Sequence, residues 1–336
     1  MHLYFFRRLS LLATVLALCV VVLGAYVRLS DAGLGCPDWP GCYGTLTVPQ
    51  SELAIQKAQT LHPDSPIDSS KAWKEMAHRY LAGALGLLVL ALFISAWRNK
   101  SHLKVNSALP TALLVIIIAQ ALLGMWTVTM LLKPAIVSAH LIGGMATLAI
   151  LTWITHRHWQ TNGNAPNIKP KIKLMARGAM IILFIQILLG GWTSTNYAAL
   201  ACTDFPTCHG AWFPEMDFKD AFHVVRALGE SINGGNLTLP ALTAIQWTHR
   251  LGALFTFIYI SLLIVIIIFK APALRSLAAI LSLLLVLQIS IGIANLLLQL
   301  PLALAVSHNL GAALLVISVI ILNSKVTEHQ HDHTKI

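Results

Sequence analysis

The chain has 336 residues, of which 57% are hydrophobic and only 11% are Asp, Glu, Lys or Arg. A soluble domain usually carries about 25% charged residues, so this composition excludes a set of water-exposed domains, and the long apolar runs exclude a disordered or fibrous chain. A net charge of +10 would suggest nucleic acid in a soluble protein, but here it can arise from membrane topology, and we expect no nucleic-acid partner.

Eight apolar segments are long enough to cross a bilayer core, which needs roughly 20 residues per helix. In chain order they are Leu9–Val27, Trp73–Trp97, Asn106–Met130, Pro134–His156, Leu174–Thr195, Ala241–Phe269, Ser276–Leu300 and Pro301–Asn323. Transmembrane strands would alternate in character, and these runs do not. The first segment could instead be a signal peptide, because Arg7 and Arg8 precede it, but no A-x-A-like site follows. We predict an all-α polytopic membrane protein.

Basic residues gather on one side of these spans. If the N-terminus is cytoplasmic, that side carries 14 of the 23 basic residues and two acidic ones, for a charge of +12, while the other side sums to −2. Because short basic loops face the cytoplasm, both termini are predicted to lie there, with the bacterial cytoplasmic membrane as the location. Large external segments are then expected at about 28–72 and 196–240, and tight external turns near 131–133 and 299–301.

The two halves of the chain repeat. Three motif pairs match, at offsets of 168, 171 and 166 residues: Gln120-Ala-Leu-Leu-Gly124 before His140 with Gln288-Ile-Ser-Ile-Gly292 before His308, Glu75-Met-Ala-His78-Arg79 with Gln246-Trp-Thr-His249-Arg250, and Cys36-x5-Cys42 with Cys202-x5-Cys208. An even number of spans per copy keeps both copies in one orientation. We predict two pseudo-symmetric four-helix bundles over 1–156 and 174–323, a basic linker over 157–173 and a polar tail over 324–336.

Four histidines lie within apolar spans near their outer ends: His78, His140, His249 and His308. Ionisable groups at such positions are costly and indicate function. Each predicted bundle receives one histidine from each of two helices, an arrangement that can hold haem iron between two imidazoles. The alternative is that each histidine hydrogen-bonds a neighbouring helix. Four in two-fold register favour ligation, and zinc is disfavoured because no further ligands stand at metal spacing.

Neighbouring residues suit a haem. Small residues that would make room for a flat macrocycle stand near the histidines, at Gly83, Gly86, Gly143, Gly144, Gly252 and Gly311. Arg79 and Arg250 are placed where a helix meets the outer interface, and they are candidates for pairing with haem propionates.

Glu75 breaks the repeat. It precedes His78 by three residues, so both project from one helix face, whereas Gln246 stands at this position in the second half. A reactive centre in one half and a passive haem in the other would explain the difference, because a carboxylate beside a haem can move protons or stabilise positive charge. The alternative is that Glu75 marks the interface and pairs with a nearby cation, Lys71, Lys74 or Arg79.

Two cysteine pairs, Cys36 with Cys42 and Cys202 with Cys208, lie in the predicted external segments, where bacterial thiols are oxidised. We expect each pair to close a disulfide that staples the loop above a haem, with a redox role as the alternative. Cys19, inside the first span, is interpreted as a core residue.

Together these features resemble the haem A synthase family, which converts haem O to haem A for cytochrome oxidase. The resemblance covers essentially the whole chain and rests on the eight spans, the Glu75-x-x-His78-Arg79 motif, the other three histidines and the cysteine loops. It implies that His249 and His308 ligate a b-type haem. It further implies that His78 and His140 flank the substrate haem O, and that Glu75 is important for oxidising its C8 methyl group to a formyl group.

The resemblance also implies partners: haem O, the haem O synthase that could supply it, an external electron donor and membrane lipid, with a homo-oligomer left open. A rival interpretation is a dihaem b-type cytochrome that exchanges electrons between quinone and a partner. It predicts two permanently bound haems and little effect of Glu75→Gln. A transporter would have broken helices and polar residues at the midplane of the membrane, which this sequence lacks.

Overall fold

A computed structural model describes residues 2–99, 107–159, 168–232 and 235–327. Within these ranges it contains no strand, and eight helices are long and apolar enough to cross a membrane. They are α1 (His2–Leu29), α3 (Ser69–Arg98), α5 (Ala108–Thr129), α6 (Pro134–Trp159), α7 (Pro170–Thr195), α9 (Leu239–Lys270), α10 (Arg275–Leu297) and α11 (Leu302–Val326). The prediction of an all-α polytopic membrane protein with eight spans is therefore confirmed.

Local sequence explains where the helices begin and end. Asp68 caps α3 by accepting a hydrogen bond from Lys71 N at 3.0 Å, as short polar side chains do at helix starts. After α5 the chain turns through Leu131 and Leu132, with φ values of 51° and 56°. After α10 a matching pair of left-handed residues, Gln299 and Leu300, has φ values of 57° and 59°. Both tight turns lie where the sequence predicts them.

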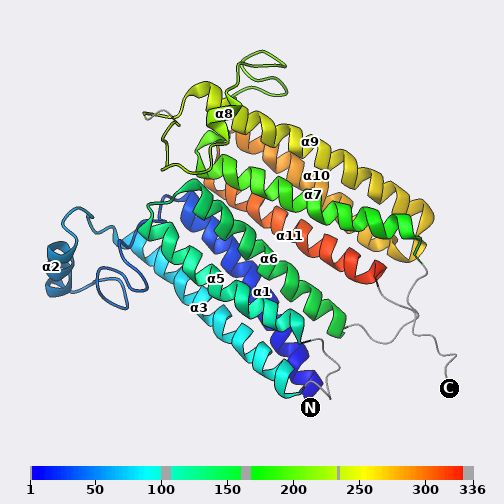
Figure 1. Ribbon diagram of the computed structural model, residues 1–336, viewed down its shortest axis with the longest axis horizontal. Helices are drawn as coiled ribbons and strands as arrows, with labels where there is room; N and C mark the ends of the chain where they lie inside the picture. The colour runs from blue at the N-terminus through cyan, green and yellow to red at the C-terminus, as the bar shows by residue number, and fades with distance from the viewer. Residues whose placement is uncertain (1, 100–106, 160–167, 233–234, 328–336) are drawn as a thin grey trace.

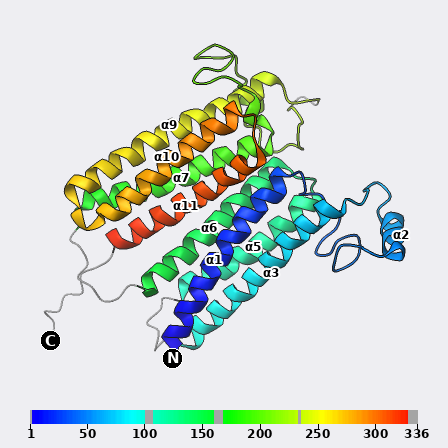
Figure 2. The ribbon, with the colours of Figure 1, turned by 180° about the vertical axis from the view of Figure 1, so that it is seen from behind.

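The helices form two groups. Helix α1 contacts α3 and α6, and α5 contacts the same two helices; α7 contacts α9 and α11, and α10 also contacts both of these. The groups lie side by side along a seam where α11 packs against α1 and α6, and α7 packs against α6 (Figures 1 and 2). The pseudo-symmetry of the groups and the domain limits at 1–156 and 174–323 stay predictions.

Buried polar groups are paired between helices, both within the second group and across the seam. Asn323 on α11 donates from Nδ2 to Ala176 O on α7 at 2.8 Å, and His156 Nδ1 on α6 lies 2.9 Å from Ser324 Oγ on α11. Such pairs satisfy groups that lipid cannot, and interhelical hydrogen bonds in membranes contribute about 0.6 kcal/mol each on average. Buried apolar side chains fill the rest of the seam.

Helix α1 begins and α11 ends at one end of the molecule, and both large connecting segments lie at the other (Figure 1). The first segment contains α2 (Glu52–Leu61), and the second contains η1 (Ala198–Leu200) and α8 (Phe218–Ala221); the short helix η2 (Pro272–Leu274) precedes α10. Parts of the predicted linker and tail, 160–167 and 328–336, lie outside the described residues. So do five charged residues used for the orientation: Lys100, Lys104, Glu328, Asp332 and Lys335.

A buried ion pair organises the second connecting segment. The Arg226 side chain is 2% exposed and lies 3.9 Å from Asp220 Oδ1. It donates to Asp220 O at 2.6 Å and to Asn196 Oδ1 at 2.7 Å. Asp220 Oδ1 also accepts from Ile232 N at 2.8 Å. Burial lowers the pKa of Arg226, and the Asp220 charge opposes that shift. The pair therefore joins the two sides of the segment to the end of α7.

We predict that Arg226→Met destabilises this segment by about 3–5 kcal/mol, because it leaves the Asp220 carboxylate buried without a counter-charge. Limited proteolysis and thermal unfolding of the detergent-solubilised protein measure the effect. Lys219→Met, at an exposed position on α8, is the control and should match the wild type. Equal protease resistance of the two variants would contradict the account.

Candidate functional site

Each of the four histidines predicted to be functional packs against a glycine of a neighbouring helix. The pairs are His78 with Gly24, His140 with Gly124, His249 with Gly190 and His308 with Gly292. A Cβ atom added to these glycines would lie 2.8–3.4 Å from the imidazole Cε1 atom. A side chain would force the ring to shift at Gly24, would be tight at Gly190 and Gly292, and would reach ordinary contact at Gly124. The close approach of glycine to imidazole is repeated in both halves of the chain.

The structure brings the histidines together in two pairs. His78 on α3 and His140 on α6 are near enough for a charge on one ring to act on the other, and the same holds for His249 on α9 and His308 on α11. All four side chains are half-buried. Each pair joins two different helices of one group, as the sequence predicts; their roles as iron ligands stay predictions.

Two of the rings present buried nitrogen atoms without a partner. Within the described part of the chain, no group in hydrogen-bonding geometry reaches Nδ1 of His78 or of His308. A buried polar atom left unpaired costs about 1–3 kcal/mol. Neutral imidazoles are ordinary axial ligands of haem iron. Two imidazoles per half, with unpaired nitrogens and glycines that admit the rings, therefore fit a haem.

Glutamine amides hold two of the rings from behind. Gln186 Nε2 lies 3.0 Å from His249 Nδ1 and donates to His249 O at 3.1 Å. With its amide oriented so that both polar groups have partners, Gln120 donates to His140 O at 3.0 Å and to His140 Nδ1 at 2.8 Å. Both contacts are to Nδ1, so they leave the opposite ring nitrogen free of the amide.

A third glutamine, Gln288, contacts the other nitrogen of its ring, with Nε2 lying 3.3 Å from His308 Nε2. In the sequence Gln120 and Gln288 stand out only as markers of the repeat, and Gln186 is not predicted. The signal that could have found all three is their common spacing, because each stands four residues before the glycine that faces a histidine.

Three glycines expected to make room for a macrocycle instead face these amides. Side chains of the glutamines occupy the space where a Cβ atom would stand: Gln120 at Gly143, Gln186 at Gly252 and Gln288 at Gly311. Among the other expected glycines, Gly83 has no atom within 4 Å of such a Cβ, and Gly86 meets only Ile117 at 3.8 Å.

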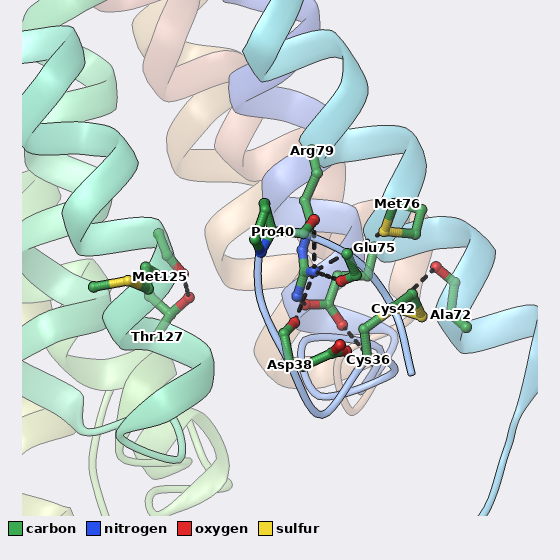
Figure 3. Close-up of polar contacts among 12 residues, drawn as sticks. Cys36, Asp38, Pro40, Cys42, Ala72, Glu75, Met76, Arg79, Met125 and Thr127 are labelled. Carbon is green, nitrogen blue, oxygen red and sulfur yellow. Dashed lines mark hydrogen bonds and ion pairs between the residues drawn. A yellow bond between two sulfur atoms is a disulfide. The ribbon is translucent and has the colours of Figure 1, made fainter. Parts of the chain in front are cut away.

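Glu75 is 4% exposed and its carboxylate has two firm partners. Arg79 Nη2, four residues along α3, lies 2.5 Å from Oε1, and Cys36 N donates to Oε2 at 2.9 Å. Figure 3 shows the carboxylate between the arginine and the cysteine loop. Pairing with Arg79 is one of the alternatives considered from the sequence; a role for Glu75 in the chemistry stays a prediction.

The arginines that directly follow His78 and His249 hold the cysteine loops. Arg79 Nη1 donates to Asp38 O at 2.9 Å (Figure 3). In the second half, Arg250 donates from Nη1 to Thr207 O at 2.8 Å and from Nη2 to Cys202 O at 3.0 Å. Each guanidinium thus ties a helix that carries a histidine to the loop above it. Pairing of Arg79 and Arg250 with haem propionates stays a prediction.

Both expected disulfides are present, Cys36–Cys42 and Cys202–Cys208. In each loop an aspartate, Asp38 or Asp204, accepts hydrogen bonds from two backbone N–H groups just beyond the second cysteine. The Thr207 hydroxyl and these N–H groups hold the pKa of Asp204 well below its usual range. The loops are therefore built alike, with their own internal hydrogen bonds.

Beneath the loops the halves differ. Gln246, the counterpart of Glu75, donates from Nε2 to Ala199 O at 2.8 Å. A carboxylate–guanidinium pair therefore supports the first loop where an amide stands in the second half. In the described part of the chain, the one cluster of three metal-ligating residue types is Cys202, Cys208 and His209. Its sulfur atoms form a disulfide, so they are not thiolate ligands.

The chain is similar to known proteins over most of its length. The model of the COX15-CtaA family, described as cytochrome oxidase assembly protein, matches residues 7–320. A haem A synthase from Shewanella oneidensis is 42% identical over 328 residues, which are 96% of this chain and 96% of that protein. Haem A synthases from Halalkalibacterium halodurans and Shouchella clausii are 27% and 26% identical, over 73% and 65% of this chain and 77% and 68% of their own.

We predict that Gly24→Ala weakens haem binding in the first half about tenfold or more, because a Cβ placed 2.8 Å from His78 Cε1 overpacks the site by about 1–3 kcal/mol. Optical titration of the purified protein with haem measures the loss. Leu87→Ala, at a position of the same helix α3 whose side chain is 70% exposed, should bind haem normally. Normal binding by Gly24→Ala would show that this contact does not position His78.

Proposed function

Because the chain belongs to the COX15-CtaA family of cytochrome oxidase assembly proteins, we propose that it is a haem A synthase, a membrane oxidoreductase acting on haem O. The observation that carries the proposal is the 42% identity to a haem A synthase over 96% of both chains. The eight membrane-spanning helices suit a substrate as apolar as a haem with a long hydrocarbon tail.

The proposed reaction converts the C8 methyl group of haem O to the formyl group of haem A. On this proposal each of two successive hydroxylations inserts one oxygen atom of dioxygen, while two electrons and two protons reduce the other atom to water. The two steps give a geminal diol, and loss of water leaves the formyl group. A resident b-type haem, ligated by His249 and His308, would supply one-electron transfer from an external donor. Gln186 would keep the His249 ring in the orientation that ligation needs, because amide contacts behind a ligand fix its ring.

In the first half, His78 and His140 would hold the substrate. Glu75 lies on α3 one turn from His78, and Arg79 and the Cys36 N–H fix its carboxylate. A carboxylate held in this way can take up a proton or stabilise positive charge that develops during oxidation. The amide of Gln246 carries no charge and does not take up a proton, so we assign the oxidation to the first half.

We place the protein in the bacterial cytoplasmic membrane with both termini in the cytoplasm. One support is the basic bias of that side of the sequence. The other is the pair of disulfides in the two large connecting segments; these segments lie at the opposite end of the molecule (Figure 1), and the outer compartment is oxidising. Partners on this proposal are haem O, the synthase that could supply it, an electron donor and lipid. The dihaem cytochrome is not favoured, since the relatives described above are haem A synthases.

The direct test is to express the chain in cells that make haem O but no haem A, and to identify the extracted pigments. We expect haem A to appear. Its absence, with an intact and haem-loaded protein in the membrane, would contradict the proposed enzyme.

We predict that Glu75→Gln lowers haem A formation about 100-fold or more, the size of effect that proton transfer groups contribute, while haem b stays bound. The amide keeps an acceptor for Cys36 N–H, so thiol labelling should show an intact disulfide. Glu52→Gln, an exposed carboxylate in the same connecting segment, is the control. Full activity of Glu75→Gln would remove the carboxylate from the mechanism.

A further inference from the structure

One histidine of the four lacks the amide contact. The glutamines that contact His140, His249 and His308 stand four residues before the glycine that faces each ring. On α1 the residue at this position, four before Gly24, is Val20. The helix whose glycine faces His78 therefore has a valine at the sequence position where the other three sites have a glutamine.

A second difference accompanies the first. The glutamine amides fit over a glycine that lies three residues after each of the other histidines, where any Cβ atom would overlap them; these are Gly143, Gly252 and Gly311. Three residues after His78 the chain has Leu81. Glutamine and glycine thus occur together at three sites, and both are replaced at the fourth.

The His78 ring is correspondingly less restrained. The backbone of Val20 interacts with the ring, but no described group meets hydrogen-bonding geometry at the buried Nδ1 atom. Gly24 contacts the ring only by van der Waals packing. A carboxamide offers both a donor and an acceptor, so it can hold either neutral tautomer of a ring, and His78 has no such partner.

Restraint behind a ligand affects how firmly it binds metal. Losing an outer hydrogen bond to a ligating histidine typically lowers metal affinity about 10- to 100-fold, because the ring is no longer fixed in its binding orientation. The second half has amides at both rings, which suits a closed, permanently six-coordinate site. The first half has an amide at His140 alone.

We propose that His78 is the exchangeable ligand of the substrate haem and His140 its fixed ligand, so that the His78 side is where a small exogenous molecule reaches the iron. This inference rests on the proposed function. In the exchange the bond from the iron to His78 would break and a bond to the incoming ligand would form, without a change in the oxidation state of the iron. The exchange site then lies beside Glu75, three residues before His78 on the same face of α3.

Carbon monoxide tests this, since it binds ferrous haem only where an axial position can be vacated. The purified wild-type protein, loaded with haem in both halves and reduced, should bind one carbon monoxide per two haems by optical titration. The double variant Val20→Gln/Leu81→Gly gives His78 the same glutamine and glycine that the other three histidines have. It should lower carbon monoxide affinity at least tenfold and give a low-spin, six-coordinate spectrum at both haems.

Two matched variants separate the effect of the amide contact from a nonspecific effect of changing these side chains. Val20→Gln alone leaves Leu81 where the amide must lie, and it should bind carbon monoxide as the wild type does. Gln186→Val, which gives His249 the residue that His78 has, should open a second carbon monoxide site. Both variants are read by spectrum and haem content, so a misfolded protein is recognised by loss of haem.

The inference is overturned if the loaded wild type binds no carbon monoxide, or if Val20→Gln/Leu81→Gly retains full haem and binds it unchanged. Assay of haem A formation in the same wild-type preparation separates the two proposals. Haem A formation with contradictory carbon monoxide results overturns only the assignment of His78. Failure to form haem A overturns the proposed function itself.

Discussion

In each half of the molecule, the imidazole rings lie directly on glycines of neighbouring helices, and the rest of the site depends on this contact. Lipid provides no hydrophobic force between helices, so spans associate through close packing of small residues and interhelical hydrogen bonds. Glycines such as Gly24 and Gly190 provide that approach, and the rings of His78 and His249 fill it. The residues proposed to hold haem are therefore also residues that determine which helices are adjacent.

Repetition supplies the frame, and departures from it are concentrated around one histidine. Disulfide loops, their aspartates and the arginines that hold them have counterparts in both halves. The carboxylate of Glu75 and the residues Val20 and Leu81 do not, and all three lie near His78 in sequence or in space. A duplicated ligand framework whose copies differ at one ring is what an enzyme needs if one copy transfers electrons and the other carries out the oxidation.

The spans and the pairing of histidines could be predicted because both follow from periodic or repeated sequence. A helix in lipid must satisfy its own backbone, so run length alone locates it. Gln186 could not be recognised as the partner of His249, because its spacing to Gly190 gains meaning only once the structure shows that Gly190 faces that ring. Nor could the engagement of Arg79 with the loop, which depends on how the chain folds back. The left-handed turn at Leu131 and Leu132 was also beyond reach, because neither residue favours positive φ.

The central claim is that the two halves hold different haems. Identifying the pigments that co-purify with His140→Ala and with His249→Ala, in cells that make both haem b and haem O, tests it most directly. The account predicts that His249→Ala lacks haem b but retains haem O, and that His140→Ala retains haem b without haem O. Loss of the same pigment from both variants would contradict it.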